Sequence, residues 1–522
     1  MEQNFKDEPN KNCDYLISEL NVPGISIERA KMLRENIAVI SSLYKEKENL
    51  TNVSSAITNS PNYISRDSLR DIISRDQKIG IIRVAEYLID RFSIKTIGKR
   101  DNTKEIYIFK DGFYKADYGL IKKEILEITQ DIISSHAREE IFKFIKDKTW
   151  IESDSFDTDN NLINLKNGVY NIKDGILLQH DPKYLFLHQI DVVYKVNANC
   201  PKFKEFVNQI LDKDSVEIIQ ELFGYCLYRS HFIKKAFIFL GEKDTGKTTL
   251  IRVLIRFISE KNISGVSLQK LVSDKFAISN LFHKHLNVYD DLSFKDVGDN
   301  GMFKILTGNG FVNGEKKFGD QFTFKNFAKL IFACNKMPNV KDTDDEAFFG
   351  RWIILRFESK PEKIDKFLFE KISTEEEMSG IFNFAIQGLT QLINKQDFSH
   401  SQTPEAIKKD MNMSASSLAQ FAYEELEAVS DPNQYISKDV MAQIYIEYVS
   451  RRNLPVMSKE SIGKKLSKFI AISDGKRSIF NNETGKMKQE SCWIGVRFKN
   501  RNIEPVAKEE PPKDDSFDFG PF

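Results

Sequence analysis

The eight residues from Gly241 to Thr248 have types and spacing that suit the binding of a triphosphate. They read Gly-Glu-Lys-Asp-Thr-Gly-Lys-Thr and satisfy the pattern GxxxxGK[ST] in full. An apolar run, AFIFL, precedes them and an amphipathic run, TLIRVLIRFI, follows, so both flanks suit a strand–loop–helix unit, and a chance glycine-rich turn does not explain them. Lys247 would reach the β- and γ-phosphates of ATP, and Thr248 would bind Mg²⁺. The residues expected to contact ATP are Gly241, Glu242, Lys243, Asp244, Thr245, Gly246, Lys247, Thr248 and Thr249.

Two adjacent carboxylates follow a second short apolar run. Asp290 and Asp291 come directly after LNVY. A pair of aspartates alone usually marks only the point where a strand gives way to a loop. Downstream of a phosphate-binding loop the pair has a chemical role: Asp290 would hold Mg²⁺ through water, and Asp291 would orient or deprotonate the attacking water.

Two further polar residues adjoin apolar runs. Asn335 follows KLIFAC, and an amide at a strand tip positions the water beside a γ-phosphate; with Pro338 close behind, it also suits a turn, and both interpretations can hold. Arg351 precedes WIILRF. It is either a surface arginine or an arginine that a neighbouring subunit supplies to stabilise the charge on the γ-phosphate.

These residues need a sheet to bring them together, and the runs beside them predict one. Fully apolar runs of this length are typical of parallel strands covered on both faces. The runs are KAFIFL (235–240), HLNVYD (285–290), KLIFAC (329–334) and WIILRF (352–357). We therefore expect an α/β core between about 233 and 360, followed by a helical region.

Length and composition restrict the alternatives. The chain has 522 residues, which predicts about three domains. Lys and Arg total 76, as do Asp and Glu, so a wholly basic coat is excluded, although a ring can still concentrate basic groups in a channel. The five cysteines lack metal-binding or redox spacing and are expected to be free thiols in a reducing cytoplasm. The polar N-terminus does not suit a secretory signal, and no apolar run is long enough to span a membrane.

The order of these motifs resembles the superfamily 3 helicases, in particular the poxvirus-type and phage/plasmid-type primase-helicases. The resemblance implies an AAA+-like P-loop core, a ring that is usually hexameric, and 3′ to 5′ movement on single-stranded DNA. Residues 306–326, LTGNGFVNGEKKFGDQFTFKN, look like the DNA-contacting hairpin of that family, with Lys316, Lys317 and Phe318 at its tip. Many members have His after the lysine; Phe318 can pack against a base but cannot donate a hydrogen bond.

The region upstream of the core resembles the domain that precedes the motor in those primase-helicases. The resemblance rests on NGVYNI, HDPKYLF, CPKFKEFVNQIL and ELFGYCLYRS. Within it, LINLKNGVYNI predicts a hairpin with a turn at Asn167-Gly168, and DSFDTDNN (154–161) predicts a solvated loop. The family often carries an N-terminal primase domain; residues 1–90 show polar helices and no carboxylate cluster, so primer synthesis is in doubt.

Residues 437–498 predict a winged helix. Ser437 and Ser458 suit the N-caps of two helices, and GKR (475–477) with WIGVRF (493–498) suit the wing. The second helix carries lysines that suit contact with DNA phosphates, although the same face suits a protein-docking module. These lysines are Lys464, Lys465 and Lys468.

The tail ends DDSFDFGPF, in which acidic and aromatic residues alternate. It suits either a peptide that recruits replication proteins or a charged solubilising tail. The expected regions are a helical N-terminal region (1–95), an α/β accessory domain (96–232), the ATPase core (233–360), a helical connector (361–414), the winged helix (415–500) and a disordered tail (501–522).

The function expected from the sequence is an ATP-dependent DNA helicase of a viral, plasmid or integrated replication system. It would act as a homo-oligomer at the replication site in the host cytoplasm, with no membrane association. The alternatives are an origin-binding initiator and a primase-helicase.

Overall fold

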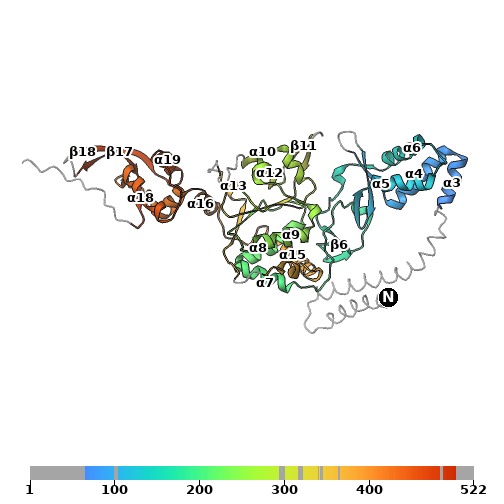
Figure 1. Cartoon of the computed structure of the whole chain (residues 1–522), viewed down its shortest axis with the longest axis horizontal. Coiled ribbons are helices and arrows are strands. Elements are labelled where there is room, and N and C mark those ends of the chain that lie inside the picture. Colours follow the sequence, from blue (N-terminus) through green and yellow to red (C-terminus); the bar gives the residue numbers. More distant parts are fainter. Residues whose placement is uncertain are drawn as a thin grey trace, which may run out of the picture. The chain divides into compact units, whose positions relative to one another are not determined.

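The computed structural model describes residues 65–98, 104–292, 300–315, 321–338, 340, 345–361, 365–481 and 486–500. The chain divides into two compact units, residues 1–194 and 195–522 (Figure 1). Within the described ranges, no helix combines the length and the apolar character needed to cross a bilayer. Four cysteines in these ranges are buried free thiols, as expected: Cys200, Cys226, Cys334 and Cys492.

The first unit packs helices on a small sheet. Polar side chains begin these helices: Asp76, for example, accepts a hydrogen bond from the N–H of Ile79. Their apolar faces, with Leu88 and Ile125 at the centre, form one core with the sheet. The helices are α3 (Arg66–Arg75), α4 (Gln77–Phe92), α5 (Tyr118–Thr129) and α6 (Ser135–Lys148). The strands, in the order β3-β2-β1-β4, are β1 (Lys95–Gly98), β2 (Lys104–Lys110), β3 (Phe113–Ala116) and β4 (Trp150–Ile151).

A second sheet of the first unit contains the predicted hairpin. Strands β5 (Leu162–Leu165) and β6 (Gly168–Asn171) pair antiparallel, and β7 (Ile176–Leu178) adds a third strand. Leu165 pairs with Gly168, so the turn is Lys166-Asn167, one residue before the expected turn. Gly168 is needed in the strand itself, because a Cβ there would lie 2.5 Å from the carbonyl oxygen of Leu178.

The second unit is built on a five-stranded parallel sheet in the order β14-β8-β13-β10-β9. Its strands are β8 (Ala236–Gly241), β9 (Ile263–Ser264), β10 (Leu286–Tyr289), β13 (Lys329–Cys334) and β14 (Trp352–Phe357). All four predicted strands are confirmed. Strand β9 was not predicted, because it has only two residues, Ile263 and Ser264, and so forms no apolar run in the sequence.

Both faces of this sheet are covered, which is why its strands are apolar without alternation (Figure 1). Successive side chains of β8 divide between the faces: Ile238 joins the core formed with α10, α12 and the β11–β12 hairpin, while Phe237 packs on Phe398 behind α15. One face carries α7 (Pro201–Ile210), α8 (Lys213–Leu227), α9 (Lys247–Ile258) and α15 (Glu375–Lys395). The other face carries α10 (Leu268–Ser273), α12 (Asn300–Leu306), β11 (Phe311–Glu315), β12 (Gln321–Lys325) and α16 (Pro404–Ala415).

Helices α8 and α15 cross with their backbones in contact. Gly224 of α8 faces the backbone of Ala385, and Gly388 of α15 faces the backbone of Gln220. A Cβ at either glycine would overlap these backbone atoms. The side-chain amide of Gln220 adds a 3.0 Å hydrogen bond to the carbonyl of Phe384. Small residues at this crossing therefore set the spacing of the helical layer beneath the sheet.

The C-terminal part of the second unit has its own apolar core around Tyr445 and Trp493. A three-stranded sheet, β16-β18-β17, packs on helices, and a separate pair joins β15 to β19. The helical elements are α17 (Ser417–Glu425), α18 (Lys438–Arg451), α19 (Lys459–Lys465) and the 3-10 turn η5 (Leu466–Lys468). The strands are β15 (Leu426–Ala428), β16 (Tyr435–Ser437), β17 (Ser473–Asn481), β18 (Lys486–Ile494) and β19 (Val496–Phe498).

The predicted helix starts of this region are confirmed, and Trp493 and Ile494 of the run WIGVRF belong to the sheet that holds GKR. The hydroxyls of Ser437 and Ser458 accept from the N–H groups of Val440 and Ser461. Gly495, at a φ of +76°, divides the run: the residues before it belong to β18, and those after it pair with β15 instead.

The glycine crossing makes a prediction about stability. Replacing Gly388 by Ala should lower the free energy of unfolding by about 1–3 kcal/mol, because the new methyl group meets backbone that cannot move aside. The matched control is Gly463→Ala in α19, where nothing lies within 4 Å of the added Cβ. The control should hold or raise the melting temperature, since Ala favours a helix by up to about 1 kcal/mol. Equal melting temperatures for the two variants in differential scanning fluorimetry would contradict the close crossing.

Candidate functional site

The loop between β8 and α9 has the geometry of an anion-binding nest. Asp244 and Gly246 both have left-handed backbone, with φ of +65° and +88°, and α9 begins at Lys247. Such a turn directs successive N–H groups toward one point at the positive end of a helix. Gly246 has a second constraint, because a Cβ there would lie 2.8 Å from Cγ2 of Ile210 on α7.

Lys247 lies over this loop. It is buried, and its ammonium group donates to the carbonyl oxygens of Gly241, at 2.6 Å, and Glu242. Burial lowers the pKa of Lys247, while the nearby charge of Asp290 opposes that shift. Thr245 is buried too and donates its hydroxyl to the carbonyl of Glu242 at 2.9 Å. The loop is therefore held by its own hydrogen bonds with a cation at its centre.

Asp290, the first of the two predicted carboxylates, lies near Lys247. Asp290 follows β10, and its side chain forms a hydrogen bond with Thr248, the residue after Lys247. Burial raises the pKa of Asp290, the neighbouring charge of Asp291 adds to the rise, and Thr248 and Lys247 oppose it. Asp291 itself is exposed. A hydroxyl and a carboxylate held together are the oxygen donors that Mg²⁺ prefers.

Asn335 reaches the same edge of the sheet. It follows β13, whose last residue, Cys334, pairs with Leu240 at the end of β8. Its side chain is exposed and lines a cavity of about 870 Å³ with Leu240 and Arg356. Because parallel strands end at one edge, the loop at 241–248, Asp290 and Asn335 share that edge.

Arg351 lies at the opposite edge of the same sheet. Its carbonyl accepts from the N–H of Ala236, the first residue of β8, at 2.7 Å. Strand β8 separates it from the loop: the five steps from Ala236 to Gly241 span roughly 17 Å at about 3.3 Å per residue. The guanidinium is half-buried and donates to Thr307 at 3.1 Å. Its burial lowers the pKa of Arg351, and Asp345 opposes the shift.

The predicted hairpin is present, but its tip lies outside the described residues, and so do Lys316, Lys317 and Phe318. Strands β11 and β12 pair in register from Phe311 with Lys325 to Glu315 with Gln321. One face packs through Phe324 on Phe282. The opposite face is exposed and carries Phe311, with the Lys325 ammonium 5.0 Å from its ring centroid.

Sequence reasoning missed a cavity beside the loop. It measures about 670 Å³ and lies between α7, the start of α9 and α14 (Leu368–Ile372). Its apolar lining includes Phe206, Ile210, Leu368 and Ile372, and Gly246 and Thr249 form the side toward the loop. The amphipathic run CPKFKEFVNQIL corresponds to α7, but nothing in that run indicates which elements α7 packs against.

Four loop residues expected to contact ATP are exposed: Glu242, Lys243, Asp244 and Thr248. Glu242 forms a 2.6 Å ion pair with Lys360, which follows β14. Lys360 and Arg356 line a cavity of about 470 Å³ with Gly241 and Thr245. These two cations were not predicted, because no motif precedes them.

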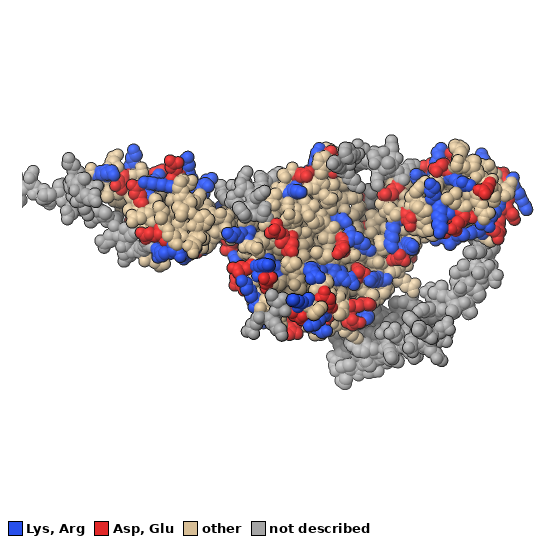
Figure 2. All heavy atoms as spheres, viewed as in Figure 1, with Lys and Arg blue, Asp and Glu red and all other residues tan. Residues whose placement is uncertain are grey.

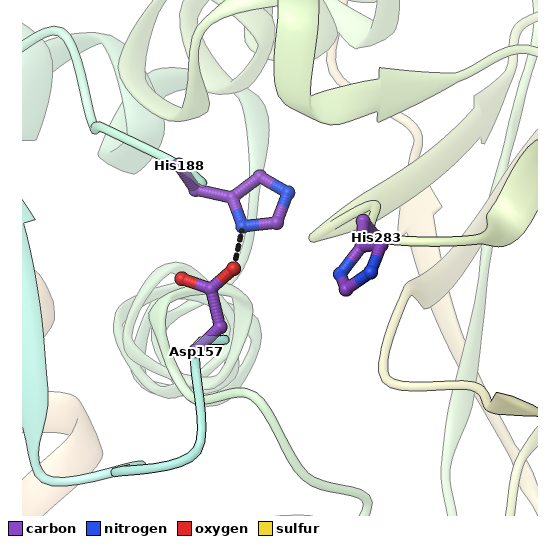
Figure 3. Close-up of side chains that lie close together, drawn as sticks. All are labelled: Asp157, His188 and His283. Atoms are coloured by element: carbon purple, nitrogen blue, oxygen red, sulfur yellow. Dashed lines mark hydrogen bonds and ion pairs between the residues drawn. The ribbon is translucent and has the colours of Figure 1, made fainter. Parts of the chain in front are cut away.

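The acidic segment 154–161 differs from the expected solvated loop. Asp157 is buried, and its Oδ2 lies 2.8 Å from Nδ1 of His188 (Figure 3). The carboxylate also accepts from the N–H of Leu187. The expectation is wrong for this residue because its carboxylate finds buried partners on a distant segment of the first unit.

The predicted DNA-contacting lysines of the C-terminal part are exposed. Lys464 and Lys465 end α19, and Lys468 ends η5. On the face drawn in Figure 2, Lys and Arg are intermingled with Asp and Glu over the described residues. This mixture agrees with the equal numbers of basic and acidic residues.

Two family models match the chain. Residues 66–212 match the model described as D5 N terminal like, and residues 239–351 match a family of unknown function (DUF5906). The first match includes residues whose motifs resemble the domain before the motor in the poxvirus-type and phage/plasmid-type primase-helicases, and it supports that resemblance. The second extends from the strand before the loop to Arg351, so all the motif residues from Gly241 onward fall inside one model.

Solved structures of the NrS-1 C-terminal region are also similar to this chain. The A-form apo structure has 12% identity and a TM-score of 0.45 over 79% of this chain and 98% of its own. The apo structure of residues 305–718 has 13% identity and the same TM-score over 80% and 99%. No curated protein matches the chain.

The loop geometry makes a prediction that needs only an inorganic probe. Gly246→Ala should weaken the binding of magnesium tripolyphosphate at least about tenfold, because left-handed backbone and contact with Ile210 cost about 1–3 kcal/mol each. Gly265→Ala is the control, since its Cβ would meet only a carbonyl oxygen at an ordinary 3.7 Å. Isothermal titration calorimetry that gave equal affinities for both variants would refute the nest.

Proposed function

We propose that this protein is an ATP-driven DNA helicase of a replication system, a motor of the superfamily 3 type that works as a ring. One observation carries the proposal. The loop, Asp290 and Asn335 share one edge of the sheet, whereas Arg351 occupies the other. A site that needs all four groups is completed only by a second copy of the chain, as in heterologous, ring-forming assemblies.

The strand order supports an AAA+-like core. Strand β13, which Asn335 follows, lies between β8, which precedes the loop, and β10, which precedes Asp290. Asn335, directly after this middle strand, therefore lies between the loop at 241–248 and Asp290. The D5-like region at 66–212 supports the primase-helicase class, in which such a region precedes the motor.

Each proposed role follows from position. N–H groups of the loop and Lys247 would bind the β- and γ-phosphates. Thr248 and Asp290 would hold Mg²⁺, which supplies charge neutralisation on the phosphates when bound. Asp291, exposed beside Asp290, would accept a proton from the attacking water, and Asn335 would orient that water. The apolar cavity lined by Phe206 and Ile210 would receive the base of ATP.

The C-terminal part supports a second DNA contact. Helix α17, strand β16, helices α18 and α19, and the β17–β18 hairpin follow in the order of a winged helix. We place DNA phosphates at the exposed lysines of α19 and η5 and assign the ring-lining contact to the hairpin tip, Lys316, Lys317 and Phe318.

Complementation between two inactive variants tests the shared site. Lys247→Ala and Arg351→Ala should each abolish ATP hydrolysis and strand separation. An equal mixture should regain activity at about a quarter of the interfaces, because there an intact loop meets an intact arginine from its neighbour. Hydrolysis of ATP by the remixed rings is the measurement. An inactive mixture in which fluorescence energy transfer shows subunit exchange would refute the proposal.

Salt dependence of DNA binding tests the C-terminal contact. Changing Lys464, Lys465 and Lys468 to Gln should weaken binding alike for all sequences and reduce the slope of log K against log[salt] by about 2–3. The control changes three exposed lysines of the first unit, Lys78, Lys122 and Lys143. An unchanged slope in the C-terminal variant would favour the protein-docking interpretation of this face.

A further inference from the structure

Arg351 forms a hydrogen bond with the segment that connects α12 to the β11–β12 hairpin. Nη1 of Arg351 donates to the hydroxyl of Thr307, which lies one residue beyond α12 and is fully buried. That hydroxyl donates its own proton to the carbonyl of Phe303 at 2.8 Å. Its lone pairs are therefore the part that faces the guanidinium, and the hydrogen bond has a fixed direction.

Two other contacts join the same pair of segments. Lys304 of α12 forms a 2.7 Å ion pair with Asp345, which begins α13 (Glu346–Phe349) by accepting from the N–H of Phe348. Phe303 stacks on Trp352, with ring centroids 4.4 Å apart and planes 15° apart. Helix α12 and the segment from Asp345 to Trp352 are thus joined by a hydrogen bond, an ion pair and a ring stack.

The other side of α12 is joined to both strands of the hairpin. Strand β11 begins four residues after Thr307. Asn326, directly after β12, is buried and donates from its side chain to the carbonyl of Leu306 at 2.7 Å. The two ends of the hairpin therefore meet at the last turn of α12, next to the hydroxyl that binds Arg351.

We propose that Thr307 is a positioning residue that couples Arg351 to the hairpin, an inference that rests on the proposed function. A shift of the hairpin on DNA moves the last turn of α12, and Thr307 transmits this shift to the guanidinium that reaches the neighbour's nucleotide. The coupling also works in the other direction, because a coupling free energy between two sites is reciprocal. Nucleotide between subunits then alters the affinity of the hairpin for DNA.

The test compares a substitution that removes the hydroxyl of Thr307 with one that keeps it. Thr307→Val keeps the branched shape and loses the acceptor, whereas Thr307→Ser keeps the hydroxyl. In the full chain we expect the ratio of DNA-stimulated to DNA-independent ATP hydrolysis to fall at least about fivefold in Thr307→Val, and to stay within about twofold of the native ratio in Thr307→Ser. A ratio that is unchanged in Thr307→Val overturns the proposal.

A binding readout separates coupling from a merely structural role. The affinity for a fluorescent oligonucleotide is measured with and without a non-hydrolysable ATP analogue. The native chain and Thr307→Ser should show a nucleotide-dependent change in Kd, and Thr307→Val should lose it. A Thr307→Val chain that keeps the native change in Kd overturns the coupling.

A third variant keeps the test decisive if Thr307→Val does not fold. Lys304→Met removes the ion pair to Asp345 from a partly exposed position, where the side chain of Lys304 has a relative exposure of 32%. It should lower the stimulation ratio in the same direction, and a native ratio overturns the proposal. Failure of the proposed function is distinguishable, because a native chain without any DNA-stimulated hydrolysis would refute the motor itself.

Discussion

The parallel register of β8, β13 and β10 is the constraint on which the candidate site depends. Cys334 pairs with Leu240, and Tyr289 pairs with Phe332, so three loops leave the sheet at the same edge. A slip of one residue would move a strand end by about 3.3 Å and exchange the faces of its side chains. Burial on both faces makes such a slip costly, because each face holds a different layer of helices.

The amino-terminal end of β13 is held by an unusual interaction. Lys329 is fully buried, and its ammonium donates to the carbonyls of Tyr228, Ser230 and Phe327 at 2.8–3.0 Å. Its Nζ also lies 4.2 Å from the ring centroid of Tyr225. Burial lowers the pKa of Lys329 to about 7. The hydrogen bonds to the carbonyls of Tyr228 and Ser230 thus tie the start of β13 to the segment after α8.

Local signals in the sequence were sufficient for much of this architecture. Apolar runs identified four strands because a strand buried on both faces needs no alternation, and the serines at 437 and 458 identified helix starts because a cap acts on the next three residues. The GxxxxGK[ST] pattern identified the loop because its constraints are local. The resemblance, not the spacing, pointed to the hairpin, and the D5-like match at 66–212 supports the upstream resemblance.

Features that depend on distant partners were not predictable. The sequence did not indicate that Asp157 would form a hydrogen bond with His188 or that Arg351 would form one with Thr307. Nor did it indicate that Ile263–Ser264 would form the edge strand β9. GKR and WIGVRF were expected to share the wing, and nothing local indicates that the second half of WIGVRF pairs with β15 instead. In each case, a contact between segments far apart in the chain overrides the local pattern.

The contact between Gly246 and Ile210 has a consequence for how such chains can be recombined. Helix α7 lies within the stretch that matches the model described as D5 N terminal like, which ends at residue 212, yet it belongs to the second unit and packs against the loop at 241–248. The two matched stretches are therefore not interchangeable cassettes. A chimera joined at their boundary would set a foreign helix against the loop, so natural exchange between relatives should leave α7 and the loop inherited as a pair.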